Sequence, residues 1–301
     1  MIRASLGDQA YWDKWTRFSE QAVDKVLDAI SRPSGNPIYR AQFVWDLSKD
    51  YLRLTLRRYS RGDAIFELFQ DFPGLLDAWE LSDRLSVEIC TEHGLKTCRD
   101  WDFSLTNLNH YNYCFWLVGL ALLLKVPDEQ WQRLLALVNG AGEDELLDRV
   151  IASRESRRRI GGRLLHPTPY ARLLKAIDAP SHEQAALLRD FVDHWYPELK
   201  RPVPRRLNAP SDQPYWYSYG DSEKYPLERG SYFGRWCIEA AAAANAFGLD
   251  DSFCLGHEHY PGDLLRPDGP STHKSKPGDV SSVGQGMVAR LLSKLRRKST
   301  P

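Results

Sequence analysis

Residues 225–265 read YPLERGSYFGRWCIEAAAAANAFGLDDSFCLGHEHYPGDLL, and this stretch decides the fold. The run 232–247 contains no proline, Ser231 is suited to be its N-cap, and Gly248 is suited to follow its last turn. Alanine has the highest helix propensity, and the alanine block 240–244 would let a neighbouring helix approach closely. The pattern therefore predicts an inner helix that other helices surround.

Glu239 immediately precedes this alanine block and is one of two charged side chains in the predicted helix. A buried carboxylate is unfavourable unless it is paired or hydrogen-bonded. Arg235 lies one helical turn earlier and is the expected partner, although a cation that precedes its anion is the weaker order. We therefore expect Glu239 to be the polar anchor of an inner helix.

The same stretch carries a resemblance to a known family. The resemblance rests on eight residues, which are Tyr232, Gly234, Trp236, Glu239, Asp250, Asp251, Tyr260 and Pro261. Together they resemble the C-terminal domain of the PoNi family, and the helical pattern upstream fits that family's N-terminal domain. PoNi proteins are immunity proteins that protect bacteria against secreted PoNe-type DNase toxins, often delivered by type VI secretion. The resemblance implies a role in interbacterial competition, with a cognate DNase toxin as the partner.

Length and composition favour a folded protein, and the cysteines favour the cytoplasm, which the resemblance implies to be that of a bacterium. The chain has 301 residues with 10 Trp, 14 Tyr and 11 Phe, which is unusual for a disordered protein. No segment near the start resembles a signal peptide, and the longest uncharged apolar run, 111–124, is too short to span a bilayer. Five scattered cysteines are most simply reduced thiols of the core. We expect no membrane partner.

The helical period predicts an all-α protein of about ten to twelve helices in two packed halves. We expect an N-terminal helical domain at 1–126 and a C-terminal PoNi-like domain at 127–265. Residues 107–124 are apolar nearly all round and predict a second inner helix. Residues 266–301 are expected to form a flexible linker and a basic amphipathic tail.

The net charge of zero hides an asymmetry. From residue 266 onward the chain has eight Lys or Arg and two Asp or Glu, so the preceding residues carry 32 basic and 38 acidic side chains. An acidic body favours a basic partner, because its field steers association. Arg154, Arg157, Arg158 and Arg159 complement the dipole of the helix that they end, so we expect no direct nucleic-acid partner.

Two acidic surfaces are candidates for contact with such a partner. The first, which we call the acidic face, lies on the predicted third helix and consists of Asp77, Glu80, Asp83 and Glu88. The second begins a later helix with Glu143, Asp144, Glu145 and Asp148. Each has a plainer interpretation, because the first fits a solvated helix face and the second complements a helix dipole.

The aromatic residues Tyr215, Trp216 and Tyr217 lie in a long proline-rich connection. Long loops in compact domains are usually functional or well packed. This cluster is therefore either a cover for the alanine helix or an exposed anchor for a partner.

The sequence shows no nucleotide-binding loop, paired CxxC site, HExxH motif or nucleophile elbow. His257 and His259 are spaced so that an extended backbone would let them share a metal, but no second His/Cys group matches them. We expect no metal, cofactor or catalytic activity. A metal-dependent hydrolase that uses these histidines and a helical scaffold with another partner remain the alternatives, and a homodimer is left open.

Overall fold

The computed structural model describes residues 1–96, 103–202 and 212–274. Within these ranges the chain forms nine α-helices and four short 3-10 helices and contains no strand, which confirms the predicted all-α class with slightly fewer helices than expected. No described helix is both long and apolar enough to cross a membrane. The predicted basic tail beyond residue 274 lies outside the described residues.

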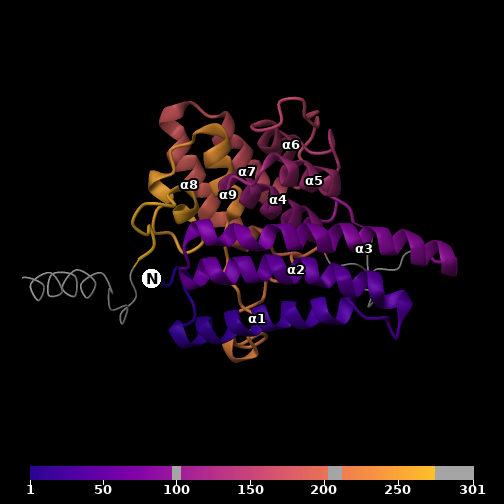
Figure 1. Cartoon of the computed structure of the whole chain (residues 1–301). Coiled ribbons are helices and arrows are strands. Elements are labelled where there is room, and N and C mark those ends of the chain that lie inside the picture. Colours follow the sequence, from indigo (N-terminus) through magenta and orange to yellow (C-terminus); the bar gives the residue numbers. More distant parts are fainter. Residues whose placement is uncertain (97–102, 203–211, 275–301) are drawn as a thin grey trace, which may run out of the picture.

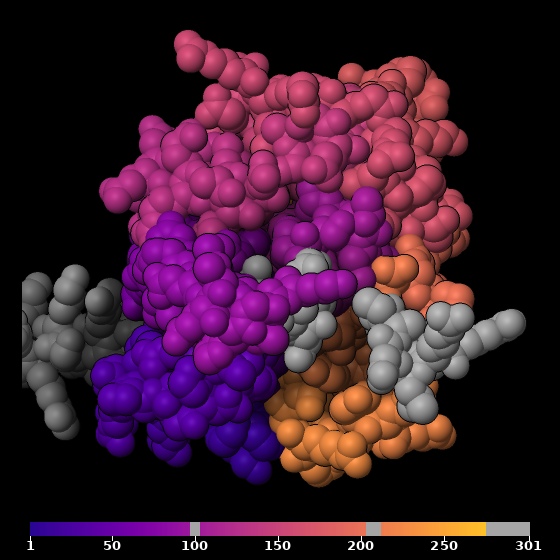
Figure 2. Space-filling view, turned by 90° about the vertical axis from the view of Figure 1, so that its right-hand side faces the viewer, coloured from indigo at the N-terminus to yellow at the C-terminus, as the bar shows by residue number. Residues whose placement is uncertain are grey.

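The first three helices form a layer in which α2 contacts both α1 and α3 (Figure 1). Their bounds are α1 Gln9–Ile30, α2 Pro37–Arg61 and α3 Phe72–His93, with η1 at Ile65–Asp71. The C-terminal end of α3 projects beyond α5 and α6 (Figure 1). Seen from that end, the first three helices occupy the lower part of the molecule and the later helices the upper part (Figure 2).

The remaining helices pack around α4 and α9. They are α4 Leu108–Leu123, α5 Asp128–Val138, α6 Glu145–Ala152, α7 Pro167–Asp178, α8 Ser181–Glu198 and α9 Ile238–Phe247. The short 3-10 helices of this part are η2 Leu227–Arg229, η3 Ser252–Cys254 and η4 Gly262–Leu265. One hydrophobic core includes residues from both predicted domains, whose boundary at residue 126 stays a prediction.

The close contact of α4 with α9 depends on small side chains. A Cβ atom at Gly119 of α4 would lie 3.0 Å from Cβ of Ala242 and 2.8 Å from Cγ2 of Ile238. Every residue of the alanine block is buried, so the side chains that allow this approach are also removed from water. Both predicted inner helices are therefore confirmed.

The predicted start of the alanine helix is wrong. Residues 231–237 are not helical, and α9 begins only at Ile238, so Ser231 is not its N-cap. Gly234 has φ +105°, and a Cβ there would meet the Trp236 indole at 2.1 Å. Ser60 of α2 holds this segment in place, because it donates to the Phe233 carbonyl and accepts from Trp236 Nε1. The predicted C-terminal position of Gly248 is confirmed by its left-handed φ of 65°.

Glu239 is fully buried and accepts hydrogen bonds from three surrounding helices. Its Oε1 accepts from Asn112 Nδ2 (2.9 Å), Tyr170 Oη (2.8 Å) and Trp195 Nε1 (3.2 Å). Its Oε2 accepts from Trp116 Nε1 at 3.0 Å. Burial raises the pKa of Glu239, and these donors oppose that effect.

The expected pairing of Arg235 with Glu239 is wrong, because the segment before Ile238 is not helical and the i, i+4 spacing does not apply there. Arg235 instead donates to the Tyr219 carbonyl at 3.0 Å and lies over the Tyr196 ring at 4.5 Å from its centroid. The buried carboxylate is thus satisfied by neutral donors alone.

Cys114, Cys237 and Cys254 are buried free thiols, as predicted. The prediction of a reduced thiol is wrong for Cys90, which is disulfide-bonded. Cys98 lies outside the described residues.

Substitution of Ala242→Leu is expected to lower the free energy of unfolding by about 1–3 kcal/mol, because the added carbons must enter the close contact with Gly119. Asn245→Leu is the matched control, since Asn245 is exposed on the same helix. It should change stability by less than about 0.5 kcal/mol. Urea denaturation monitored by circular dichroism compares the two, and equal stability would show that the α4–α9 contact tolerates bulk.

Substitution of Glu239→Gln is expected to destabilise the protein by about 1–3 kcal/mol. The NH2 group of the glutamine cannot accept a hydrogen bond, so it would face a buried donor that now lacks its acceptor. Glu183→Gln on the exposed start of α8 serves as the control. Chemical denaturation of both variants measures the difference. A Glu239→Gln variant as stable as its control would contradict the role of the carboxylate as an anchor.

Candidate partner-binding surface

The acidic face of α3 is held partly by an arginine from α5. Arg133 contacts Asp77 through Nη2 at 2.5 Å and Glu80 through Nε at 2.8 Å. These hydrogen bonds, first that of Glu80, raise the pKa of the Arg133 guanidinium. Glu88 is exposed on the projecting half of α3, and Asp83 is half-buried. The face therefore keeps exposed carboxylates on a rigid helix, with two of them fixed by one cation.

The second predicted surface is divided by burial. Glu143 is exposed, and Glu145 is half-buried with Arg149 3.6 Å away. Asp144 and Asp148 are each 1% exposed, so the prediction that these two contact a partner is wrong.

The physical reason is that both aspartates close the loops around α6. Asp144 caps α6 through the Leu147 amide at 2.7 Å, and it also accepts from Tyr111 Oη and the Leu165 amide. Asp148 accepts from the amides of Gly142 and Gly161 and pairs with Arg158 Nε at 2.6 Å. Their side chains are therefore used inside the fold.

The aromatic cluster covers the core instead of forming a fully exposed anchor. Trp216 is 2% exposed, stacks on Trp116 with ring centroids 4.8 Å apart, and donates from Nε1 to Asn112 Oδ1. The position of Trp216 therefore agrees with a cover for the core and not with an exposed anchor for a partner. Tyr215 and Tyr217 are half-buried, and Tyr217 stacks on Tyr196 at 4.6 Å.

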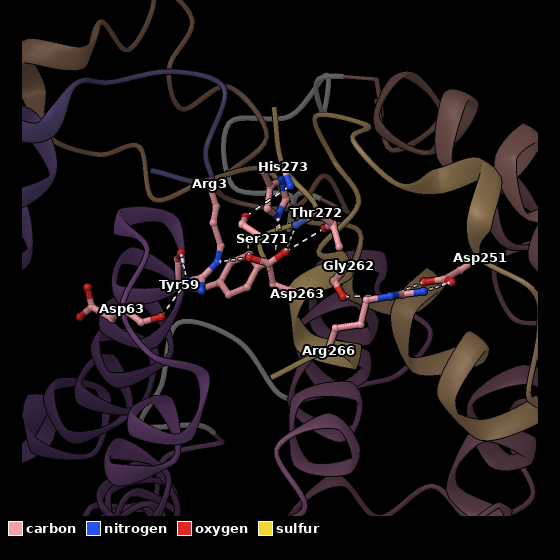
Figure 3. Close-up of polar contacts among 10 residues, drawn as sticks. All are labelled: Arg3, Tyr59, Asp63, Asp251, Gly262, Asp263, Arg266, Ser271, Thr272 and His273. Atoms are coloured by element: carbon pink, nitrogen blue, oxygen red, sulfur yellow. Dashed lines mark hydrogen bonds and ion pairs between the residues drawn. The ribbon is translucent and has the colours of Figure 1, made fainter. Parts of the chain in front are cut away.

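The residues that carry the resemblance are mainly structural in their placement. Tyr232, Trp236, Tyr260 and Pro261 are buried, and Asp250 is exposed and accepts from the Ser252 amide. Asp251 accepts from Tyr260 Oη at 2.7 Å. It also pairs with Arg266 at 2.5 Å, as Figure 3 shows.

Asp263 joins the beginning of the chain to the C-terminal segment (Figure 3). Its Oδ2 accepts from Arg3 Nε at 2.6 Å, and its Oδ1 accepts from the Thr272 amide at 2.6 Å. Arg3 also donates from Nη1 to the carbonyls of Tyr59 and Asp63 at the end of α2. This clamp fixes the first layer of helices to residues 263–272.

The two histidines considered as metal ligands have other partners. His257 lies 3.2 Å from Asp193 and accepts from the His259 amide through Nδ1. His259 Nδ1 lies 3.1 Å from the Arg235 carbonyl oxygen. Within the described ranges, no group of three or more His, Cys, Asp and Glu side chains is placed to hold a metal ion.

The family comparison covers nearly the whole chain. Residues 142–264 match the family described as PoNe immunity proteins (PoNi), C-terminal, and residues 3–136 match PoNe immunity protein (PoNi), N-terminal. The chain belongs to the PoNi family. The two PoNi regions meet between α5 and α6, so the acidic face lies in the N-terminal region and the Glu239 anchor in the C-terminal one.

A solved structure has the same PoNi-like arrangement of helices. The chain is similar to the crystal structure of protein PA2201 from Pseudomonas aeruginosa, with a TM-score of 0.63 and 19% sequence identity. The match covers 88% of this chain and 90% of that one, and it shows the fold. The comparison with curated proteins gives no match.

The clamp contains a buried histidine that makes stability depend on pH. His273 Nε2 lies 3.0 Å from Tyr59 Oη, and burial lowers the pKa of His273 from 6.5 to about 4, although Asp263 favours its charged form. Between these values the unfolded chain binds a proton that the folded chain does not. The free energy of unfolding therefore falls as pH falls from 6.5 to 4, by up to about 3 kcal/mol.

The variant His273→Gln is expected to lose part of this pH dependence, because a neutral amide keeps a hydrogen bond to Tyr59 without binding a proton. Burial also lowers the pKa of His259 to about 4, so the dependence should shrink and not vanish. Urea denaturation at several pH values gives the free energy of unfolding at each pH, and the slope of this energy against pH is compared between variants. The exposed His182→Gln is the control. Identical slopes in both variants would contradict the assignment.

Proposed function

We propose that this PoNi protein binds a PoNe-type DNase toxin and neutralises it by covering its active site or its DNA-binding groove. The observation that carries the proposal is the match of both halves of the chain to PoNe immunity proteins. The protein acts in the bacterial cytoplasm against a toxin delivered by type VI secretion. It acts by binding and needs no chemistry of its own.

Charge complementarity supports this mode of action. A DNase holds a phosphate backbone, so its substrate groove is rich in Lys and Arg. The first 265 residues of this chain carry 38 acidic and 32 basic side chains. An acidic surface opposite a basic groove accelerates association, and buried contacts then slow dissociation.

The acidic face of α3 is the contact surface we propose. It lies on a helix of 22 residues that packs against α2 along the first layer. Arg133 fixes Asp77 and Glu80 without cancelling their combined charge, and Glu88 is exposed beyond them. Rigid carboxylates lose little conformational freedom on binding, which favours a tight complex.

The alternative functions have less support. A hydrolase centred on His257 and His259 would need free ligand atoms, whereas the structure engages these side chains with Asp193 and with backbone groups. A scaffold with an unrelated partner is favoured by no specific contact.

The test is a triple charge reversal, Asp77→Lys with Glu80→Lys and Glu88→Lys. Association with a purified cognate PoNe-type DNase is expected to slow by about 10- to 100-fold at low salt, with a smaller difference at high salt. Stopped-flow fluorescence measures the rate, and protection of DNA from cleavage measures neutralisation.

The matched control reverses Glu183, Glu223 and Glu228, which are exposed on other elements and change the net charge equally. Its association rate with the DNase should fall far less than that of the acidic-face variant. If both variants associate alike, the acidic face is a solvated surface. If the wild type neither binds nor inhibits the DNase, the proposed function itself fails.

A further inference from the structure

A hollow of about 420 Å³ lies between α1, α2 and the loop that leads to α9. Trp15, Phe18 and Ala22 of α1 form one wall, and Arg53 and Arg57 of α2 form another. Arg229 and Tyr219 of the loop complete it. The segment 212–237, drawn in orange, lies beside α1 in both views of the molecule (Figures 1 and 2).

Arg57 is a buried cation without a carboxylate partner. It is 3% exposed, and its Nη atoms donate to the carbonyls of Trp15 and Gly230 and to Ser19 Oγ. Its Nε has no hydrogen-bond partner, and no Asp or Glu of the described ranges lies within ion-pair distance. Buried charges are normally paired, so this guanidinium is unusual. Burial, and next the charge of Arg53, lower its pKa to about 10.

The rest of the hollow also has an excess of positive charge. Arg53 pairs with Asp50 at 2.9 Å, which is the only carboxylate among the lining residues that the structure describes. Arg229 is exposed and donates only to the Lys224 carbonyl among the contacts of the described chain. Three guanidinium groups thus face one carboxylate, in a body that is otherwise acidic.

Aromatic side chains line the same hollow. The rings of Trp15 and Phe18 meet edge to face with centroids 5.4 Å apart, and Phe18 remains 56% exposed. A bound apolar group would cover this exposed surface. Guanidinium groups bind carboxylates and phosphates through paired hydrogen bonds, but inorganic phosphate would leave the aromatic wall uncovered.

We propose that this hollow binds a carboxylate that carries an apolar or aromatic group. The carboxylate would lie against the arginines and the attached group against Trp15 and Phe18. Such a ligand is either a small organic acid or a side chain or chain end of a protein partner. Because α2 lies between α1 and α3, the hollow is on another side of the first layer from the acidic face, and this inference does not depend on the proposed function.

Benzoate is the probe, with benzamide as its neutral counterpart and inorganic phosphate as an anion without an apolar group. Isothermal titration of the full chain at constant ionic strength should give benzoate a dissociation constant on the order of 1 mM, as expected for so small a ligand. Benzamide and phosphate should bind at least about tenfold more weakly.

Two variants test the place of binding. Ala22→Phe fills the hollow from α1, and Arg229→Gln removes the exposed guanidinium without touching the buried one. Each should weaken benzoate binding by about tenfold or more. Ala10→Phe, an exposed position on the same helix, is the control and should bind benzoate like the wild type.

Absence of benzoate binding to the wild type, or binding unchanged in both hollow variants, would overturn the proposal. Equal affinity for phosphate and benzoate would also overturn it, since it would show a general anion site. Where benzoate binds as expected, its effect on the complex with the PoNe-type DNase distinguishes the two sources. Competition assigns the carboxylate to the protein partner, and simultaneous binding assigns it to a small organic acid.

Discussion

The fold depends on satisfying one buried carboxylate. Glu239 lies in the first turn of the helix with the smallest side chains, and its four donors come from α4, α7 and α8. Hydrogen bonds are directional, so these helices must present Asn112, Trp116, Tyr170 and Trp195 at fixed positions around it. Asn112 extends the network by accepting from Trp216, which brings the proline-rich connection onto the core. The alanine block and Gly119 then allow the helices to approach closely enough for these bonds to form.

The first layer is joined to this core by polar contacts at its edge. Ser60 bonds the non-helical segment before α9, and Arg3 pairs with Asp263 (Figure 3). These contacts do not involve the carboxylates of the acidic face on α3. They also do not involve the arginines of the hollow between α1, α2 and the loop. The molecule therefore presents an acidic face and an arginine-lined hollow around one shared hydrophobic core, each suited to a different kind of contact.

Sequence periodicity was sufficient to predict the all-α class, both inner helices and the helix end at Gly248, because these depend on local preferences. It failed where distant residues decide the local structure. The segment before Ile238 is non-helical and bonded to Ser60, so the helical pairing expected for Arg235 does not form. Asp144 and Asp148 were predicted to lie on a charged surface, because the residues next to them in the sequence do not reveal the loops whose amides they bind. The arginine hollow combines residues of three separate segments, so no single stretch of the sequence could reveal it.

The clamp between Arg3 and Asp263 also affects how the protein is made. These two residues are separated by 260 positions, so the clamp forms only when nearly all of the described chain has been synthesised. At about 5–20 residues per second, a ribosome needs roughly 13 to 50 s to add the residues between them. The last of these helices, α3, ends at His93, so for roughly 9 to 34 s of that interval α1 to α3 are complete but Asp263 has not yet been added. Until the later helices are made, the apolar surface that they cover in the finished protein is exposed, and such transiently exposed surface favours aggregation.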